Sequence, residues 1–359
     1  MCSRTPGVAS SSANTPRQAR RPTHRFRAGI LAPVTRHFPL IIVAALALLA
    51  TACQGGQGHL ATDATTTPTT APTSSIPPTT EASTANTSAT TTSAASSTTS
   101  TAAHTGSARA AISLDKLSSP RSASATARTL SRVEVGLRGK DRGARRLQRL
   151  GRDQQLAYRA LVRHPGWVAE VVKKVPDSVR SAVQANIDAG TALSKLTGSG
   201  SAPTTLPDWT ILEPLPAATL RGYYSEAEQA SGVSWAYLAA IHLVETRMGR
   251  IHGNSSAGAQ GPMQFIPTTF AEYGEGGDIN DDHDAILAAG RFLAANGAAT
   301  DIDHALFRYN NDDRYVAAIK AYAGAMLTNE RAYDGYYQWR VFYATANGAF
   351  LLPEGSRAG

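Results

Sequence analysis

The chain has 359 residues and a formal net charge of +8, with 35 Lys and Arg against 27 Asp and Glu. Its single apolar run and two cysteines exclude a multi-pass membrane protein and a disulfide-stapled scaffold. Seven of the arginines lie in residues 1–36, which contain no acidic residue. The positive charge therefore belongs mostly to this leader and does not indicate an anionic partner for the whole chain.

The first 53 residues have the features of an export signal. Residues 40–50 are all apolar, follow the Arg-rich stretch and precede Thr51 and Ala52. The run is shorter than the about 20 residues of a spanning helix, and its flanks are typical of a signal peptide. Small residues that end at a cysteine resemble a bacterial lipobox, which predicts lipidation of Cys53 and anchoring to the outer face of the cell membrane. The alternatives are an ordinary signal peptide, which would give a secreted protein, and an uncleaved anchor.

Residues 54–117 are predicted to be a disordered stalk. Between positions 61 and 105, 26 of the 45 residues are Ser or Thr, and four prolines interrupt them. Such a composition buries too little apolar surface to offset the entropy of ordering the chain, and it is typical of O-glycosylated stalks. A flexible coil of this length spans roughly 45 Å, which suits a tether that holds a domain away from a membrane.

Residues 118–200 are predicted to form three or four helices, because their apolar residues recur at helical spacing. We expect breaks near Gly151, at 164–166 and before Asp177, which would be the N-cap of the last helix. This segment is also basic, since residues 116–200 hold 17 Lys and Arg against 6 Asp and Glu. The charge predicts either a face that binds anionic wall polymers or lipid headgroups, or merely a solvated helical face.

The C-terminal part has the opposite charge and follows a linker at 198–207. Residues 208–359 contain 10 basic and 18 acidic residues, which argues against nucleic acid as a partner of this part. Its expected helices cover 217–231, 235–248, a short helix opened by a capping box at 269–272, 285–295 and 313–328. The expected N-caps are Ser234, Asp284 and the pair of Asp312 and Asp313. No alternating strand pattern of useful length occurs, so the fold class is predicted to be mainly α.

Glu245 is the strongest candidate for acid–base chemistry. It lies near the C-terminal end of an expected helix that is otherwise apolar, with Leu238, Ile241 and Val244 around it. Apolar neighbours and the negative helix end both disfavour ionisation of a carboxyl group, so its pKa is expected to rise. A raised pKa is what a general acid needs near neutral pH. The alternative is a surface glutamate paired with a nearby arginine.

A Gly-rich stretch at 258–261 and the amide of Gln264 follow, and such groups suit hydrogen bonding to sugar hydroxyls and acetamides. Together with Glu245 they belong to four ordered blocks: 245–249, 261–267, 277–280 with 284–286, and 308–310 with Tyr315. These blocks resemble the lytic murein transglycosylases, most closely the membrane-bound lytic murein transglycosylase B group. The resemblance covers about 208–345 and leaves out the stalk, the basic segment and the tail at 346–359.

The resemblance implies a lysozyme-like, mostly helical domain that acts on peptidoglycan glycan strands. It implies cleavage of the β-1,4 bond between N-acetylmuramic acid and N-acetylglucosamine, with a 1,6-anhydromuramyl end as the product and no cofactor or metal ion. Glu245 matches the family's single catalytic acid, which acts first as an acid and then as a base, whereas ordinary glycosidases use two carboxylates. The positions that match the family's substrate-binding residues are Met263, Gln264, Phe265, Tyr309 and Asn310.

Two other functions stay open at this stage. The family commonly has a hydroxyl residue where this chain has Asp312. If Asp312 pointed into the cleft and oriented a water molecule, the enzyme would be a hydrolytic muramidase; if it caps the following helix, as we expect, it has no such part. A non-catalytic wall-binding module that keeps the cleft is the third hypothesis.

Several other residues have a structural and a functional interpretation. The acidic run 278–284 alternates like a calcium loop, but it lacks the glycine and the final glutamate of an EF-hand, so we expect a turn and a helix cap. His242, one turn before Glu245, is expected to be a packed or bridging residue rather than a catalytic one. The aromatic residues of the last segment are expected to pack it onto the core, with a sugar-stacking platform as the alternative. These residues are Tyr333, Tyr336, Tyr337, Trp339 and Tyr343.

Overall fold

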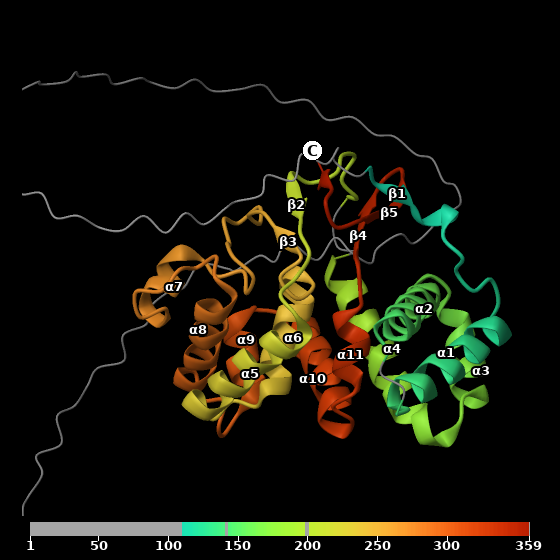
Figure 1. The fold of residues 1–359 in the computed structure, drawn as a ribbon, viewed down its shortest axis with the longest axis horizontal. Coiled ribbons are helices and arrows are strands. Elements are labelled where there is room, and N and C mark those ends of the chain that lie inside the picture. The colour runs from blue at the N-terminus through green and yellow to red at the C-terminus, as the bar shows by residue number, and fades with distance from the viewer. Residues whose placement is uncertain (1–109, 141–142, 198–200, 359) are drawn as a thin grey trace, which may run out of the picture. The chain divides into compact units, whose positions relative to one another are not determined.

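The computed structural model describes residues 110–140, 143–197 and 201–358. The expected leader, Cys53 and the stalk up to residue 109 lie outside the described residues. Within them the chain is mainly α, as predicted, with helices α1 to α11 and two small sheets (Figure 1). No helix among the described residues combines the length and apolar character that crossing a membrane requires.

The described residues of the basic segment form four α-helices, α1 (Ala123–Arg138), α2 (Ala144–Arg163), α3 (Val168–Lys174) and α4 (Asp177–Thr197). Ser122 begins the first of them, because its side chain accepts a hydrogen bond from the backbone N–H of Ala125 at 3.2 Å. The predicted breaks at 164–166 and before Asp177 are confirmed: a short 3-10 helix at Pro165–Trp167 follows α2, and α4 begins at Asp177.

The predicted break near Gly151 is wrong, because α2 continues through this residue. Gly151 allows helices to approach each other closely instead. A Cβ atom at this position would lie 2.4 Å from Cβ of Gln338 and 2.8 Å from the carbonyl oxygen of Gly335. Gly151 therefore marks a packing contact inside a helix. The low helix propensity of glycine wrongly indicated a helix break at this position.

The C-terminal part contains seven helices: α5 (Ala217–Ser231), α6 (Trp235–Thr246), α7 (Pro267–Tyr273), α8 (Asp282–Ala295), α9 (Ile302–Tyr309), α10 (Asp313–Thr328) and α11 (Ala332–Tyr337). The bounds of α5 and α10 are those predicted. The apolar helix α6 packs against α5, α8, α10 and α11, so it forms the centre of this part (Figure 1). Every residue of α6 except Tyr237 is buried.

Two predicted caps are wrong. Thr269 lies inside α7, which begins at Pro267, because proline is well suited to the first turn of a helix. Asp281 rather than Asp284 caps α8, and its side chain accepts the backbone N–H groups of His283 and Asp284 at 2.8 and 3.1 Å. In both cases the helix begins earlier than the polar residue that the pattern favoured.

Two antiparallel sheets were not predicted. One has the order β1 (Ile112–Ser113), β5 (Gly348–Leu352), β4 (Val341–Thr345), and the other has the order β3 (Ile251–His252), β2 (Trp209–Ile211), β6 (Arg357–Ala358). All five residues of β4 are buried, so this strand shows no alternation of apolar and polar residues. The expectation of a disordered stalk is also wrong for its last residues, because β1 pairs with β5.

The basic segment and the C-terminal part share one hydrophobic core. Helix α4 packs along α10, and α2 packs against α11 (Figure 1). Buried hydrogen bonds cross the same boundary, from Trp339 to Gln154 and from the Tyr336 hydroxyl to Asn186, each at 2.9 Å. The expectation that the late aromatic residues pack onto the core is confirmed for Tyr333, Tyr336, Trp339 and Tyr343, which are buried, while Tyr337 is half-buried.

Candidate active site

Glu245 lies in the last turn of α6 with its side chain inside the protein. Only 1% of the residue is exposed, and Ile241 and Val244 beside it are fully buried. The apolar surroundings expected from the sequence are therefore present, and the carboxyl group is more deeply enclosed than a surface glutamate. Burial raises the pKa of Glu245 to about 8, so the group is largely protonated at neutral pH.

The two oxygen atoms of this carboxyl group have different surroundings. Oε1 accepts a hydrogen bond from the hydroxyl of Tyr315 on α10 at 2.8 Å. This bond favours the charged form and partly opposes the effect of burial on the pKa of Glu245. Oε2 is buried and has no hydrogen-bond partner among the described residues. Buried polar atoms are rarely left without partners, so Oε2 is the carboxyl oxygen that remains free to bond to a ligand.

The alternative in which Glu245 pairs with a nearby arginine is wrong. Arg247 donates to the carbonyl of Leu243 at 3.0 Å. Arg250 forms an ion pair with Glu354 at 3.0 Å and donates to the backbone carbonyls of Tyr337 and Arg247. Both guanidinium groups therefore stabilise the backbone around the end of α6.

The backbone immediately after Glu245 is unusual. Arg247, Met248 and Gly249 have φ angles of 59°, 62° and 78°, three consecutive residues in the left-handed region. Two of them are not glycine, and such conformations are strained and concentrate at functional sites. Gly249 suits this turn by its φ of 78°, and a Cβ atom there would lie 2.8 Å from Oδ1 of Asp282, so that side chain would have to move.

The structure brings the four sequence blocks into contact with one another. The hydroxyl of Thr246, next to Glu245, donates to the carbonyl of Pro262 at 2.6 Å. Gly261 lies directly against the third block, since a Cβ atom there would be 1.8 Å from the carbonyl oxygen of Ile279. No other residue fits at this position, and its φ of 72° independently favours glycine.

The fourth block, 308–310 with Tyr315, contacts the second block. Tyr309, the last residue of α9, donates its hydroxyl proton to the carbonyl of Met263 at 2.7 Å. Its ring is parallel to that of Tyr315, with centroids 6.4 Å apart, and meets Phe265 edge to face at 5.6 Å. Tyr315 was part of the sequence pattern but was not predicted as a site residue, because 70 residues separate it from Glu245.

Gln264 and Asn310 are both buried but differ in their bonding. The Gln264 amide donates to the carbonyls of Gly261 at 3.0 Å and Gly253 at 3.4 Å, so it bonds to its own loop. Asn310 follows α9 directly, and its Nδ2 atom is buried without a hydrogen-bond partner among the described residues. Asn310 therefore has a free donor available for a ligand, whereas the donors of Gln264 serve the loop geometry in this structure.

His242 is packed in the core, as predicted. Its Nδ1 atom is 2.8 Å from the hydroxyl of Tyr224, and Nε2 is 3.3 Å from Oδ1 of Asp282. Burial lowers the pKa of His242 to about 3, and the same effect raises the pKa of Asp282 to about 6. The imidazole is therefore neutral, and neither its Nε2 atom nor Oδ1 of Asp282 has a hydrogen-bond partner among the described residues.

The acidic residues near the site mainly serve as caps. Asp312 caps α10 as expected, accepting the backbone N–H of Arg314 at 2.8 Å, and it also binds the guanidinium of Arg314 at 2.5 Å. In the run 278–284, Asp284 accepts the backbone N–H of Asp278 at 2.9 Å. This bond forms a turn in the run, as predicted, and Asp281, His283 and Asp284 each place one potential ligand atom within 4.8 Å of the others.

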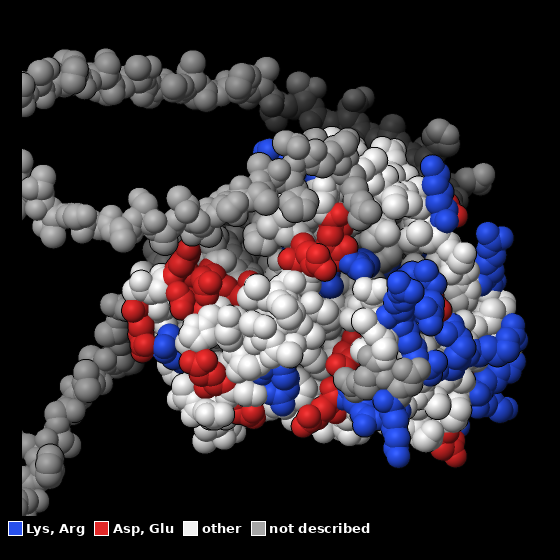
Figure 2. Space-filling view, viewed as in Figure 1, with Lys and Arg blue, Asp and Glu red and all other residues white. Residues whose placement is uncertain are grey.

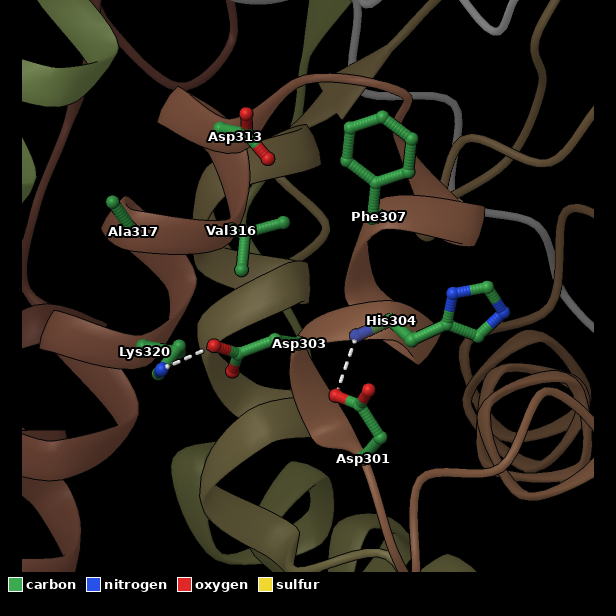
Figure 3. A pocket seen from close by; sticks show the side chains of 8 residues that line it. All are labelled: Asp301, Asp303, His304, Phe307, Asp313, Val316, Ala317 and Lys320. Carbon is green, nitrogen blue, oxygen red and sulfur yellow. Dashed lines mark hydrogen bonds and ion pairs between the residues drawn. The ribbon is translucent and has the colours of Figure 1, made fainter.

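A separate hollow of about 670 Å³ lies between α9 and α10, the helices that supply Tyr309 and Tyr315 (Figure 3). Two of its charged groups, Asp303 and Lys320, form an ion pair at 2.7 Å, and Asp301 accepts the backbone N–H of His304 at 3.0 Å. None of the described residues predicted for the site lines this hollow, so we assign it no part in the chemistry.

The arrangement as a whole contains one protonated carboxyl group, one free carboxyl oxygen and a wall of aromatic rings. A buried acid of this kind can donate a proton to a ligand oxygen and, after ionising, accept one back. No carboxylate among the described residues acts on the pKa of Glu245, so its acidity is set by burial and by Tyr315.

Comparison with protein-family models, with curated proteins and with solved structures finds no match to this chain.

Proposed function

We propose that this protein is a lytic transglycosylase of peptidoglycan, with a lysozyme-like domain similar to those of the membrane-bound lytic murein transglycosylase B group. It cleaves the β-1,4 bond between N-acetylmuramic acid and N-acetylglucosamine in glycan strands. The observation that carries the proposal is the buried carboxyl group of Glu245, with Oε1 held by Tyr315 and Oε2 unpartnered. The contact between the four sequence blocks that resemble the family supports it.

The reaction uses Glu245 twice. The protonated carboxyl group donates its proton to the glycosidic oxygen as the bond from that oxygen to C1 of the muramyl residue breaks. The substrate's own acetamide group stabilises the positive charge that develops at C1. Glu245, now a carboxylate, removes the proton of the muramyl C6 hydroxyl while its oxygen attacks C1. The carboxyl group ends the cycle protonated, and a 1,6-anhydro ring has formed without water.

The surroundings of Glu245 suit both halves of this cycle. Burial keeps the proton on the carboxyl group until a substrate oxygen accepts it. The Tyr315 hydroxyl then stabilises the carboxylate that forms, because a hydrogen bond to an ionised acceptor is stronger than one to a neutral acceptor. Glu245 is only 1% exposed, so this reaction requires an opening beside Oε2 through which the glycan strand reaches the carboxyl group.

The second candidate is a hydrolytic muramidase, which adds water in place of the C6 hydroxyl. That reaction needs a further group to orient the water, and Asp312 was the residue considered for this part. Asp312 is occupied as the cap of α10 and as the partner of Arg314. This bonding favours the transglycosylase, in which one carboxyl group suffices.

A non-catalytic wall-binding module is the third candidate. A binding module gains nothing from an acid with a raised pKa, because a buried carboxyl group with a free oxygen only lowers stability. The pKa of Glu245 therefore favours an enzyme.

The decisive experiment is digestion of purified glycan strands by the full chain and by a Glu245→Gln variant. We expect 1,6-anhydromuramyl ends, which resist borohydride reduction, and loss of all cleavage in the variant with glycan binding retained. Reducing ends would identify the muramidase instead. Unchanged cleavage by the variant would exclude Glu245 as the acid, and absence of cleavage by the unaltered chain would leave the binding module.

The site of action follows from the leader rather than from the folded part. We propose that the enzyme is exported and anchored to the outer face of the cell membrane through a lipid on Cys53, with the Ser/Thr-rich stalk as the tether. Mass spectrometry of the mature N-terminus tests this proposal. A diacylated Cys53 is expected, and an unmodified N-terminus at another residue would indicate a secreted protein.

A further inference from the structure

Basic side chains line a groove of about 730 Å³ on the first helical segment. Figure 2 shows Lys and Arg gathered over the region in which Figure 1 places α1 to α4, whereas Asp and Glu are more frequent over the other helices. The four cations that line the groove are Arg128, Arg132, Arg146 and Lys174. They come from three helices, α1, α2 and α3, so the fold rather than one helix face brings them together.

The cations of the groove are available to a ligand to different degrees. Arg128 is exposed and has no ion-pair or hydrogen-bond partner among the described residues. Arg132 pairs with Asp153 at 2.8 Å, and Lys174 pairs with Glu170 at 2.7 Å. The side chains of Arg132 and Lys174 are 55% and 50% exposed, so these pairs contribute little to stability and an incoming anion can replace the acidic partner of either cation.

We propose that this groove binds a linear anionic polymer of the cell wall that carries phosphate groups along its chain. Several cations along one groove match a chain of regularly spaced anions better than they match a single ion. The assignment to the wall rests on the proposed function, whereas polyanion binding by the groove does not. The groove would then hold the enzyme at its substrate, independently of the chemistry at Glu245.

The shape and lining of the groove favour a polymer over a membrane. Proteins that lie on a membrane present a basic surface together with several apolar side chains that enter the lipid. Here the cations line a hollow, and Val135, 49% exposed, is the large apolar side chain beside them that is open to solvent.

The lining also disfavours a nucleic acid. Proteins that bind single strands without sequence preference combine cations with aromatic rings on which the bases stack. The residues that line this groove are Ser, Ala, Val, Gly, Arg and Lys, with no aromatic ring among them. Recognition would therefore depend on the phosphates alone, as it does for a polymer without bases.

The test is binding of linear polyphosphate to the full chain, compared with an Arg128→Gln and Arg132→Gln double variant. Removing two cations from a polyanion site is expected to weaken binding about thirtyfold, and added salt should reduce the difference. The matched control is a Lys173→Gln and Lys195→Gln double variant, which loses the same charge from exposed positions of the same segment that do not line the groove. The control should bind nearly as tightly as the unaltered chain.

Each other outcome overturns the proposal. Equal weakening in both double variants would mean that net charge, and not the groove, binds the polymer. Tighter binding to an oligothymidylate of equal charge than to polyphosphate would identify a nucleic-acid site. Binding to phosphatidylglycerol vesicles in excess of phosphatidylcholine vesicles, lost in the groove variant while polyphosphate binding stays, would identify a membrane site.

Polyanion binding by the groove and glycan cleavage at Glu245 are tested independently. Glu245→Gln should bind polyphosphate as tightly as the unaltered chain, because Glu245 does not line the groove. The groove variant should cleave purified glycan strands that carry no anionic polymer at an unchanged rate. Loss of this cleavage in the groove variant would contradict a binding role that is independent of catalysis.

Discussion

Two buried carboxyl groups, Glu134 in the first helical segment and Glu245 in the C-terminal part, have almost the same exposure, 2% and 1%. Glu134 is fully bonded: Oε1 accepts from Gln154 at 2.9 Å and from Tyr158 at 2.5 Å, and Oε2 pairs with Arg138 at 2.6 Å. Glu245 has Tyr315 as the partner of Oε1 and none among the described residues for Oε2.

This difference in bonding distinguishes a carboxyl group with a structural role, Glu134, from one suited to proton transfer, Glu245. A carboxyl group that holds helices together is surrounded by donors and a cation, because a buried charge without partners destabilises the fold. A carboxyl group that transfers a proton must instead stay neutral and keep one oxygen free.

The largest effect should come from replacing each glutamate with glutamine. Glu245→Gln should lower the cleavage rate by about 10³-fold or more, because the proton donor is lost, and should leave the free energy of unfolding unchanged or raised at neutral pH. Glu134→Gln should lower the free energy of unfolding by about 2–4 kcal/mol, because Arg138 loses its buried partner. Urea denaturation and rates of anhydromuropeptide release measure the two effects. If Glu245→Gln unfolded the protein and Glu134→Gln did not, the comparison would be reversed.

The next effect concerns the glycine that lets the sequence blocks meet. Gly261→Ala should lower the free energy of unfolding by about 2–4 kcal/mol, because its Cβ atom would collide with the Ile279 carbonyl. Gly258→Ala is the matched control, since Gly258 also has a positive φ, of 80°, but its Cβ atom would meet nothing within 4 Å. The control should lose about 1 kcal/mol by the same measurement. Equal losses would show that the close approach does not matter.

The third prediction is a pH dependence of stability that Glu245 alone introduces. Its pKa in the folded state, about 8, lies above the ordinary value of 4.5, so the unfolded chain releases this proton first. The contribution of Glu245 to the free energy of unfolding should therefore be largest below pH 4.5. It should decrease between pH 4.5 and about 8 and stay constant at higher pH. Glu245→Gln should remove this decrease. The free energy of unfolding of the variant, relative to that of the unaltered chain, should therefore rise by a few kcal/mol across that pH range. A constant difference between the two proteins at all pH values would refute the raised pKa.

The smallest effect should come from Tyr315→Phe. Its hydroxyl favours the ionised form of Glu245, so its removal should raise the pKa of Glu245 further and move the alkaline limb of the pH–rate profile upward. The cleavage rate should fall about tenfold, because the carboxylate that forms in the first step loses about 1.5 kcal/mol of stabilisation. Tyr309→Phe is the comparison, since its hydroxyl bonds to the Met263 carbonyl and should leave that limb in place.

Local patterns predicted local structure well. The bounds of α5 and α10 agree with the prediction, because a glycine follows one and an aspartate cap precedes the other. The caps at Thr269 and Asp284 were wrong because other residues, Pro267 and Asp281, begin those helices earlier. Local sequence rules therefore place the first residue of a helix only to within about one turn.

The remaining features depend on contacts between distant residues. Gly151 carries the signature of a helix break, yet its role is set by α11 nearly 190 residues later. The strand β4 lacks alternation because both of its faces are covered. Within the site, the sequence indicated the apolar surroundings of Glu245, whereas its bond to Tyr315 and the left-handed turn at 247–249 follow from how α6, α10 and α8 meet.

The most direct test of the proton donor is a measurement of its own ionisation. Glutamate labelled with carbon-13 at the carboxyl carbon can be followed by NMR across pH, and the Glu245 signal is assigned as the one missing from Glu245→Gln. We expect a midpoint near 8 for this signal. A midpoint near the ordinary value of 4.5 would show that the carboxyl group is ionised at neutral pH and is not the proton donor.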